Sequence, residues 1–417
     1  MAQTELEPDS LLNGLEVFEV GGAVRDRLMG VDAPDRDFVV VGATPESMVK
    51  RGFRPVGRDF PVFLHPETHE EYALARTERK SGHGYRGFVF HAGRDVSLVD
   101  DLARRDLTVN AMALDADGLL IDPYNGRLDL ERGILRHVSP AFREDPVRVL
   151  RLARFATRFG HFRIADETQA LCREMVEDGE VDYLVPERVW QEMAKALMYP
   201  RPSRFFDVLR EVGALAVILP EFDALFGVPQ PARYHPEIDS GRHSLMVLDR
   251  AAALGGSLAV RFSALVHDLG KALTPREAWP AHHGHEKTGL EPIAALCDRL
   301  AVPNRCRELA LRVCAGHLLA HRALELRPSK VLGLLESLDG LRRPELVDDF
   351  LLSCQADWQG REGRATAPYP QADYLLRALA LARAVEARQF LEQGLTGQAI
   401  GEAMRQARLK AIASIAR

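Results

Sequence analysis

The sequence contains no run of about 18 uncharged apolar residues, which is the length that a membrane-spanning helix requires. The first residues, Met1–Ser10, are acidic and lack the basic and apolar regions of a signal peptide. We therefore expect a cytoplasmic protein with no membrane partner, in which residues 1–14 form a short disordered leader.

Cysteine is scarce, with five residues in a chain of 417, and no two of them form a Cys-x-x-Cys pair. They are Cys172, Cys297, Cys306, Cys314 and Cys354. A small, odd and irregularly spaced set argues against a disulfide framework and against a zinc ribbon, and it fits a reducing cytoplasm.

The chain also has no excess of positive charge, because its formal net charge is -6. A nucleic acid is attracted by local patches of charge, so clusters of arginine matter more than the total. Apolar residues make up 46% of the composition and charged residues 27%, as in an ordinary globular protein. A length of 417 residues exceeds one compact core and predicts two or more domains.

The first part of the chain is expected to mix strands and helices. Apolar runs predict strands at 17–20 and 38–41, with a helix at 24–28 between them. Asp117-Gly118 predicts a hairpin turn between strands at 112–114 and 119–121. Four glycines within 76–93 suggest a mobile loop.

From Pro140 onward the pattern is helical almost without interruption. Apolar residues at helical spacing predict helices at 144–158, 186–198 and 204–212. A further helical region, rich in histidine, follows after Glu237. The fold class is therefore α+β, with an α/β head followed by all-α domains.

An acidic pair stands at the second expected strand. Asp35 and Asp37 alternate at period two, so both carboxylates point to one side of the chain. Carboxylate oxygens are the ligands that Mg²⁺ prefers, and two Mg²⁺ ions are needed to transfer a nucleotide from a triphosphate. An Asp-x-Asp turn alone is common on protein surfaces and would carry little weight.

The glycine pair before that strand makes a catalytic role for the acidic pair more specific. Gly21-Gly22 lets backbone N–H groups approach a phosphate, and the helix that begins there favours negative charge. Arg25 lies one turn into this helix, where its guanidinium can reach a phosphate oxygen. The combination predicts a metal-dependent nucleotidyltransferase.

These segments resemble those of a known family. Residues 21–26 (GGAVRD) and 35–37 (DRD) resemble the opening motif and metal-binding pair of the class II tRNA nucleotidyltransferase and poly(A) polymerase family. Residues 104–111 (RRDLTVNA) and 122–126 (DPYNG) resemble its next two motifs, in family order. The resemblance implies a polymerase-β-like head with catalytic Asp35 and Asp37, magnesium as cofactor, and tRNA, ATP and CTP as partners. It also implies that four residues of the head bind the nucleotide: Gly22, Arg25, Arg105 and Asp106.

A second arginine cluster follows the head. Arg148, Arg151 and Arg154 recur at steps of three and fan over one face of the expected helix, with Asp145 within reach of Arg148. An Asp–Arg pair offers donors and an acceptor in one plane, so it can imitate a Watson–Crick edge. A solvated arginine-rich face is the plainer interpretation. The resemblance favours the first, because the family's Glu-Asp-x-x-Arg motif serves as its protein template for C and A. It also implies that Arg151 and Arg154 bind the nucleotide's phosphates or the tRNA end. The loop 76–93 matches the family's flexible element, which is involved in switching from CTP to ATP.

The histidine-rich region carries a second candidate chemistry. His267-Asp268 ends the apolar run 262–266, with His243 upstream and Asp357 downstream. Imidazole and carboxylate groups together suit a transition-metal ion. The pattern resembles the HD phosphohydrolase superfamily, which implies metal ligands at His243, His267, Asp268 and Asp357 and catalytic roles for His267 and Asp268. His283, His285 and His317 are possible extra ligands, whereas Asp348 and Asp349 compete with Asp357.

The expected domains follow from these motifs. They are a leader (1–14), a nucleotidyltransferase head (15–139), a helical neck and body (140–236), an HD phosphohydrolase domain (237–360, core about 240–341) and a C-terminal helical tail (361–417).

The fusion of the two chemistries resembles bacterial family members that add CCA to tRNA. Those members also act as phosphatase, 2′-nucleotidase and 2′,3′-cyclic phosphodiesterase, with a transition metal such as Ni²⁺ in the HD domain. Three alternatives stay open: a poly(A) polymerase, a specialised CC-adding or A-adding enzyme, and a catalytically inactive RNA-binding protein. The chain is expected to be a monomer or a homodimer.

Overall fold

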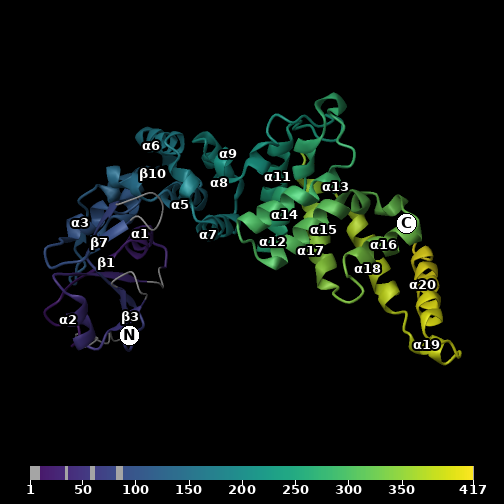
Figure 1. Ribbon diagram of the computed structural model, residues 1–417, viewed down its shortest axis with the longest axis horizontal. Coiled ribbons are helices and arrows are strands. Elements are labelled where there is room, and N and C mark those ends of the chain that lie inside the picture. Colours follow the sequence, from purple (N-terminus) through teal and green to yellow (C-terminus); the bar gives the residue numbers. More distant parts are fainter. Residues whose placement is uncertain (1–9, 33–35, 57–61, 81–87, 417) are drawn as a thin grey trace. The chain divides into compact units, whose positions relative to one another are not determined.

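The structure is a computed structural model that describes residues 10–32, 36–56, 62–80 and 88–416 (Figure 1). The chain divides into two compact units. Unit 1 comprises Met1–Val185 and Glu211–Ala214, and unit 2 comprises Pro186–Arg210 and Leu215–Arg417. The division falls inside the segment 140–236, for which a separate neck and body is expected.

Unit 1 is built on a mixed sheet with the strand order β3-β4-β5-β2-β1-β8-β9. Its strands are β1 (Glu16–Val20), β2 (Asp37–Val41), β3 (Arg54–Val56), β4 (Val62–Leu64), β5 (Glu71–Leu74), β8 (Ala113–Leu114) and β9 (Leu120–Ile121). β2 pairs in parallel with β5 and antiparallel with β1. Two smaller pairs are antiparallel β6 (Thr77–Lys80) with β7 (Phe88–His91), and parallel β10 (Ile134–Leu135) with β11 (Arg163–Ile164).

Helices cover both faces of the sheet. The helices of unit 1 are α1 (Gly22–Leu28), α2 (Pro45–Lys50), α3 (Leu98–Ala103), α4 (Gly126–Arg132), α5 (Val147–Arg158) and α6 (Asp166–Glu177). On one face Phe38 and Val40 of β2 pack with Met48 of α2, and on the other Val39 packs with Leu102 of α3. Because β2 is buried on both faces, it is a continuous apolar run.

The expected strands and helices of unit 1 are confirmed, with three differences. The hairpin β8–β9 closes through residues 115–119, where Asp115 Oδ1 accepts from the N–H of Leu119 at 2.7 Å. The expected loop 76–93 contains the strands β6 and β7, since threonine, valine and phenylalanine favour extended backbone. The helix expected from 144 begins only at Val147, because the residue before Pro146 is forced into extended conformation.

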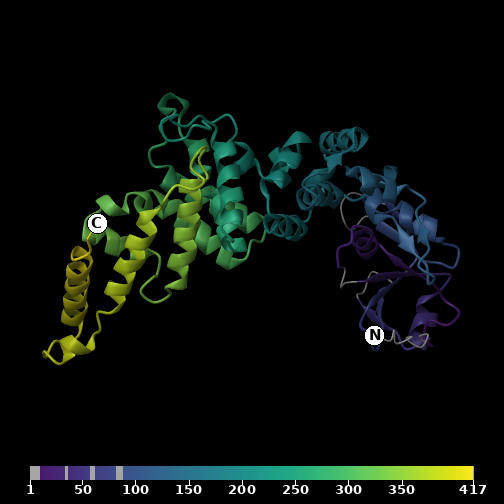
Figure 2. The same cartoon turned by 180° about the vertical axis from the view of Figure 1, so that it is seen from behind.

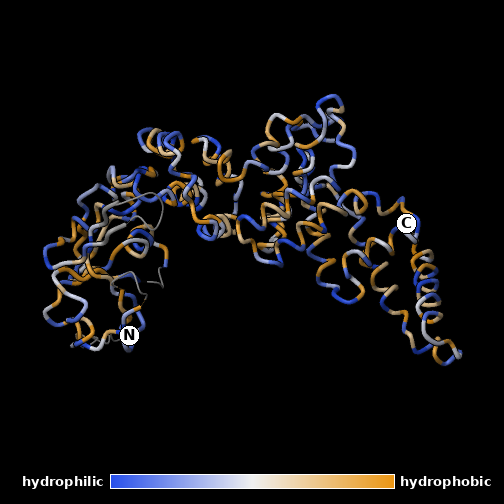
Figure 3. Tube along the Cα trace, viewed as in Figure 1, coloured by the Kyte–Doolittle hydropathy of each residue, from blue (hydrophilic) through white to orange (hydrophobic). Residues whose placement is uncertain are grey.

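From residue 186 the described chain is helical. Its helices are α7 (Pro186–Leu197), α8 (Ser203–Glu211), α9 (Ala214–Ile218), α10 (Pro220–Asp223), α11 (Ser240–Ala253), α12 (Leu258–Val266), α13 (His285–Thr288), α14 (Leu290–Arg299), α15 (Asn304–His321), α16 (Pro328–Ser337), α17 (Glu345–Gln359), α18 (Pro370–Arg383), α19 (Arg388–Leu391) and α20 (Gln398–Ala413). Orange and blue residues alternate along them in Figure 3, as amphipathic helices require. Both views show α18 and α20, in yellow, side by side (Figures 1 and 2).

α12 is the central helix of unit 2. Its residues from Ala259 to Val266 are all buried, and it contacts α11, α15 and α17. A helix enclosed in this way has no polar face, which explains the apolar run before His267. No helix of the described chain is both long and apolar enough to cross a membrane.

All five cysteines are buried and free. Burial raises the pKa of Cys172, Cys297 and Cys314 to about 12 and that of Cys306 to about 11. Burial also raises the pKa of Cys354 well above its usual range. These thiols remain protonated at neutral pH.

Candidate functional sites

The turn between β1 and α1 is shaped by glycine. Gly21 has φ +75°, and a Cβ there would lie 2.9 Å from Nη1 of Arg105. A side chain at this position would therefore be strained twice, by backbone conformation and by the guanidinium. Gly22 starts α1, and its Cβ would lie 3.5 Å from Nη2 of Arg25. The absence of side chains at the glycine pair therefore lets the backbone of this turn lie close to the guanidinium groups of Arg105 and Arg25.

The register of β1 and β2 sets an acidic residue beside that turn. Asp37 is the first residue of β2 and pairs with Val20, the last residue of β1. Its backbone is paired and its side chain is exposed, on the same face of the sheet as Val39. Asp35 lies outside the described residues.

Arg25 occupies a different position from the one expected of a phosphate contact. It is only 2% exposed, and its Nε donates to Asp26 Oδ1 at 2.9 Å. Its Nη1 donates to Asn110 Oδ1, and its guanidinium lies 5.2 Å from the ring centre of Phe159. Burial lowers the pKa of Arg25, although the charge of Asp26 opposes this shift. These partners hold the side chain inside the unit.

Asp106 is the centre of the same network. Its Oδ1 accepts from Asn110 Nδ2 at 3.0 Å and from the N–H of Leu107 at 2.8 Å. Its Oδ2 accepts from Arg151 Nε at 2.7 Å. Burial alone would raise the pKa of Asp106, but the charge of Arg151 and these hydrogen bonds hold it below its usual range. Both carboxylate oxygens therefore accept hydrogen bonds from groups of the protein itself.

Arg105 is anchored by a buried acid that the sequence did not single out. Asp101 Oδ2 accepts from Arg105 Nη2 at 3.2 Å, and its Oδ1 accepts from Arg104 Nη2 at 2.6 Å. Burial would raise the pKa of Asp101, but these two guanidinium charges keep it lowered. The guanidinium groups of Arg104 and Arg105 are therefore both held by Asp101 of α3.

The pair proposed for base selection lies at the start of α5. Asp145 Oδ1 accepts from the N–H of Val147 at 3.0 Å and so caps the helix. Arg148 is buried, and its Nη1 and Nη2 donate to the carbonyls of Ala141 and Arg104, each at 2.6 Å. These two bonds hold the guanidinium of Arg148 at the start of the helix.

The arginine face of α5 is not a solvated one. Arg154 is buried, with its guanidinium 4.3 Å from the ring centre of Phe155. Arg158, also missed by the sequence reasoning, donates from Nη2 to Asp26 Oδ2 at 2.8 Å. A helical spacing of four from Arg154 was the signal that could have revealed it.

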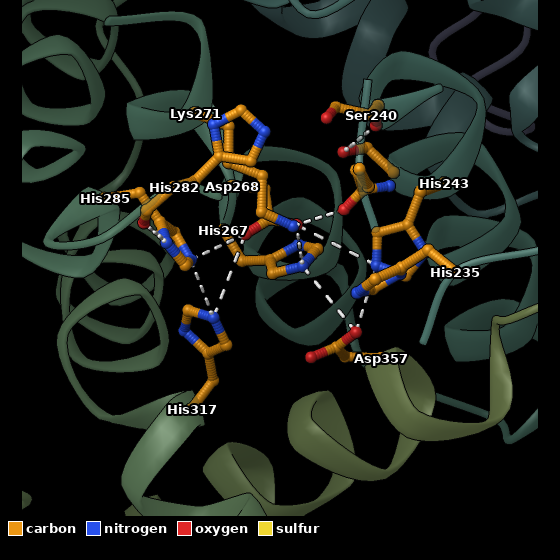
Figure 4. Close-up of polar contacts among 12 residues, drawn as sticks. His235, Ser240, His243, His267, Asp268, Lys271, His282, His285, His317 and Asp357 are labelled. Carbon is orange, nitrogen blue, oxygen red and sulfur yellow. Dashed lines mark hydrogen bonds and ion pairs between the residues drawn. The ribbon is translucent and has the colours of Figure 1, made fainter. Parts of the chain in front are cut away.

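In unit 2 the expected histidines and acids converge on one buried cluster, the HD cluster, formed by His243, His267, Asp268, His285, His317 and Asp357 (Figure 4). Two groups of potential metal ligands lie within it and share one acid. The first is His243, His267 and Asp268; the second is Asp268, His285 and His317. Figure 4 shows them meeting Asp268 from opposite sides.

Distances within the HD cluster are short. His267 Nε2 lies 3.0 Å from Asp268 Oδ2, and His243 Nε2 lies 3.8 Å from the same oxygen. On the other side His285 Nε2 lies 3.2 Å from Asp268 Oδ1. Each Asp268 oxygen faces a separate imidazole group, so Asp268 could serve as a metal ligand together with either group.

The imidazoles are oriented by their other nitrogen. Nδ1 of His267 donates to the carbonyl of Ala264 at 2.8 Å, and Nδ1 of His285 donates to that of His282 at 2.7 Å. Nδ1 of His317 donates to the carbonyl of Val313 at 3.0 Å. Nε2 of each ring therefore faces the cluster and offers a lone pair when the ring is neutral, which is the arrangement of metal-ligating histidines.

Charges in the HD cluster favour ionised acids. Burial would raise the pKa of Asp268, but His267 and Lys271 hold it well below its usual range. Nζ of Lys271 lies 2.6 Å from Asp268 Oδ2. Burial would lower the pKa of His267, yet the Asp268 charge raises it overall, whereas burial lowers that of His317 to about 3.

Asp357 of α17 closes the HD cluster. Its Oδ1 lies 3.1 Å from His243 Nε2 and 3.9 Å from His267 Nε2. Its two rivals lie elsewhere: Asp348 is exposed, and Asp349 pairs with Arg305 at 3.3 Å. His283 is exposed as well.

Three residues beside the HD cluster were missed by the sequence reasoning. Glu237 Oε1 lies 2.8 Å from His243 Nδ1 and 3.0 Å from His235 Nδ1. His321 Nε2 lies 2.6 Å from Asp357 Oδ2. His321 falls four residues after His317, a helical spacing that could have found it, whereas Glu237 and His235 sit in a loop without a motif.

Three protein-family descriptions match the chain. Residues 17–136 match a poly A polymerase head domain, residues 161–226 a probable RNA and SrmB- binding site of polymerase A, and residues 241–348 an HD domain. Asp357 lies beyond the last match.

Solved structures share the fold. An apo CCA-adding enzyme matches with a TM-score of 0.66 and 20% identity, over 97% of this chain and 89% of its own. A Thermotoga maritima CCA-adding enzyme complexed with tRNA matches with a TM-score of 0.63 and 21% identity, over 97% and 88%.

Curated relatives match along almost the whole chain. The multifunctional CCA protein of Alkalilimnicola ehrlichii is 60% identical over 405 residues, covering 97% of this chain and 98% of that protein. That of Laribacter hongkongensis is 62% identical over 379 residues, covering 91% and 93%. The order of head, helical region and HD domain agrees with the geometry of both units, and the chain belongs to the multifunctional CCA protein family.

Proposed function

We propose that this chain adds and repairs the 3′-terminal CCA of tRNA with CTP and ATP, in the cytoplasm. The observation that carries the proposal is the close similarity to multifunctional CCA proteins over 97% of the chain. Solved structures of the same fold include CCA-adding enzymes in complex with tRNA, with CTP and with ATP.

Asp35 and Asp37 would hold the Mg²⁺ ions of unit 1. The exposed carboxylate of Asp37 beside Gly21 fits an ion that prefers oxygen ligands. When bound, the two ions activate the attacking 3′-hydroxyl and neutralise the triphosphate. The role of the glycine turn is to keep side chains away from the incoming nucleotide.

The arginines of unit 1 would select and orient the nucleotide. Arg148 and Asp145 would together form the face for the ring nitrogen and the exocyclic amine of C and A. Arg151 and Arg105, fixed by Asp106 and Asp101, reach the phosphates or the tRNA end. Arg25 and Asp106 act by holding this face in place, since their donors and acceptors are used inside the unit.

We further propose that the HD cluster of unit 2 hydrolyses phosphoesters, as phosphatase, 2′-nucleotidase and 2′,3′-cyclic phosphodiesterase. Its donor set fits a transition metal such as Ni²⁺, because inward-facing imidazoles are combined with buried carboxylates. Nε2 of His267 and Oδ1 of Asp268 are buried without a hydrogen-bond partner among the described residues, as expected of metal ligands. When bound, the metal supplies a hydroxide at neutral pH. Glu237 orients His243, and Lys271 keeps Asp268 ionised.

One experiment tests the first proposal against its rivals. Purified chain is given tRNA lacking CCA and each nucleoside triphosphate alone or in combination, and the products are sequenced. Addition of C, C and A followed by a stop supports the proposal. A long A tail would identify a poly(A) polymerase, and addition of only C or only A a specialised enzyme. No incorporation by a folded chain would favour an inactive RNA-binding protein.

A further inference from the structure

The segment that follows the last acid of the HD cluster carries two arginines and an indole whose partners are incomplete. Arg361 lies one helical turn after Asp357, and its side chain is only 9% exposed. Its Nε is buried without a hydrogen-bond partner among the described residues, and so is Nε1 of Trp358. Buried donors without acceptors are costly, so each calls for an explanation.

The guanidinium of Arg361 faces the HD cluster. Its Nη2 lies 3.7 Å from Oδ1 of Asp357, the same oxygen that lies 3.1 Å from His243 Nε2. This separation is too long for a hydrogen bond. The N–H of the next residue, Glu362, donates to Glu237 Oε2 at 3.3 Å, which places this segment beside the Glu237 loop.

A second guanidinium stands beside the first. Arg364 lies 4.8 Å from the ring centre of Trp358, and Arg361 lies 5.1 Å from the same centre. In the described part of the chain no carboxylate pairs with Arg364. The two guanidinium groups share one indole, and among the described residues the carboxylate paired with either of them is Asp357, at 3.7 Å from Arg361.

A cation held by Asp357 would add positive charge beside these two guanidinium groups. The carboxylate charge would then be shared with the metal, and less of it would remain to offset the Arg361 guanidinium. An anion that contacts both the guanidinium and the cluster restores the balance and supplies the missing acceptors.

We propose that Arg361, Arg364 and the Trp358 indole form an anion-binding subsite that receives the phosphoryl group of a nucleotide phosphoester at the HD cluster. The inference rests on the proposed phosphohydrolase function of unit 2. Arg361 holds the phosphoryl oxygens from inside, whereas Arg364 holds them from the partly exposed side. Trp358 fixes the planes of both guanidinium groups by stacking.

The test uses the full chain loaded with Ni²⁺ and four variants: Arg361→Gln, Arg361→Lys, Arg364→Gln and, as matched control, Arg383→Gln. Arg383 is exposed at the end of α18. Affinity for inorganic phosphate is measured by calorimetry, with Asp268→Ala defining the binding outside the HD cluster. KM and kcat for 2′,3′-cyclic AMP, metal content and nucleotide addition to tRNA are measured in parallel.

We expect Arg361→Gln to weaken phosphate binding and raise KM by about tenfold, and Arg364→Gln to do so by about threefold. Arg361→Lys should recover part of the loss, and Arg383→Gln should change nothing. Metal content and nucleotide addition should stay at the wild-type level.

Wild-type phosphate affinity in both Arg361→Gln and Arg364→Gln would overturn the subsite. A fall in metal content that accounts for the whole effect would overturn it too, because Arg361 would then only position Asp357. A wild-type chain that hydrolyses no phosphoester defeats the proposed function of unit 2, but the phosphate titration still decides the subsite. If Arg361→Gln does not fold, Arg361→Lys and Arg364→Gln decide it.

Discussion

The two units neutralise their buried acids in different ways. In unit 1 Asp26, Asp101 and Asp106 each accept from guanidinium groups, which stay charged at every accessible pH. In unit 2 Asp268 and Asp357 are met mainly by imidazoles, which can give up a proton and bind a metal instead. The first arrangement is a permanent scaffold around the proposed nucleotide site, whereas the second suits the exchange of a proton for the proposed metal ion.

The sharpest test of this contrast is Asp268→Ala. Since the two ligand groups share Asp268, the variant should lose metal and reduce phosphoester hydrolysis by about 10³-fold or more. CCA addition should stay at the wild-type rate. Both activities are assayed on one preparation, with Asp348→Ala, an exposed acid of α17, as the control. Loss of both activities in a folded variant would contradict the separation of the sites.

The reciprocal change is Asp37→Asn in unit 1. Removing a carboxylate from the proposed Mg²⁺ pair should lower nucleotide addition by about 10³-fold, because the metal neutralises charge during transfer. Hydrolysis by unit 2 should be unaffected. Single-turnover addition to tRNA measures the effect, and the exposed Asp32→Asn serves as the control. Normal addition by Asp37→Asn would remove Asp37 from the site.

The scaffold itself is tested by Arg25→Ala. Loss of this buried guanidinium removes the donor to Oδ1 of Asp26 and to Oδ1 of Asn110, and it should lower the free energy of unfolding of unit 1 by about 3 kcal/mol. The more exposed Arg27→Ala, which breaks a pair with Glu19, should cost about 1 kcal/mol or less. Urea dependence of hydrogen exchange in α1 and α5 peptides measures both. Equal effects would mean that Arg25 is not a buried anchor.

The orientation of the imidazoles is tested by Glu237→Ala. Without the carboxylate beside Nδ1, His243 is less firmly oriented, and Ni²⁺ affinity should fall about tenfold. Competition with a chelator measures the affinity, and Glu277→Ala, on an exposed turn, is the control. An unchanged affinity would show that Glu237 has no part in holding His243.

The smallest effect concerns pH. The pKa of Asp106 is lowered in the folded state, so its contribution to stability is complete at neutral pH. That contribution declines as pH falls below the unfolded pKa of about 4 and is lost as pH passes the folded pKa. The difference in unfolding free energy between wild type and Asp106→Asn should therefore be smaller at pH 3 than at pH 7. A constant difference would contradict the ionic role of Asp106.

The parts of the fold that were predictable are those with strong local patterns. β2 is a continuous apolar run, and α12 ends in His267-Asp268, so both could be located from the sequence. The start of α5 was misplaced because a proline overrode helical spacing at Asp145.

The site residues that could not be predicted from the sequence are brought to the sites by tertiary contacts. His243 and Asp357 stand 114 residues apart, and a shared motif was needed to connect them. Glu237 and Arg361 belong to no motif, so only folding reveals that they border the same cluster. The burial of Arg25 was equally hidden, since an arginine in a glycine-rich opening motif suggests a surface contact.

The buried cysteines have a practical consequence. Because all five thiols are enclosed and protonated at neutral pH, maleimide reagents have no reactive native target. A cysteine introduced at the exposed Asp117 of unit 1 and another at Arg383 of unit 2 would therefore take fluorophores selectively, without prior removal of native residues. The wild-type chain therefore needs no removal of native cysteines before the distance between one labelled site in each unit is measured by energy transfer.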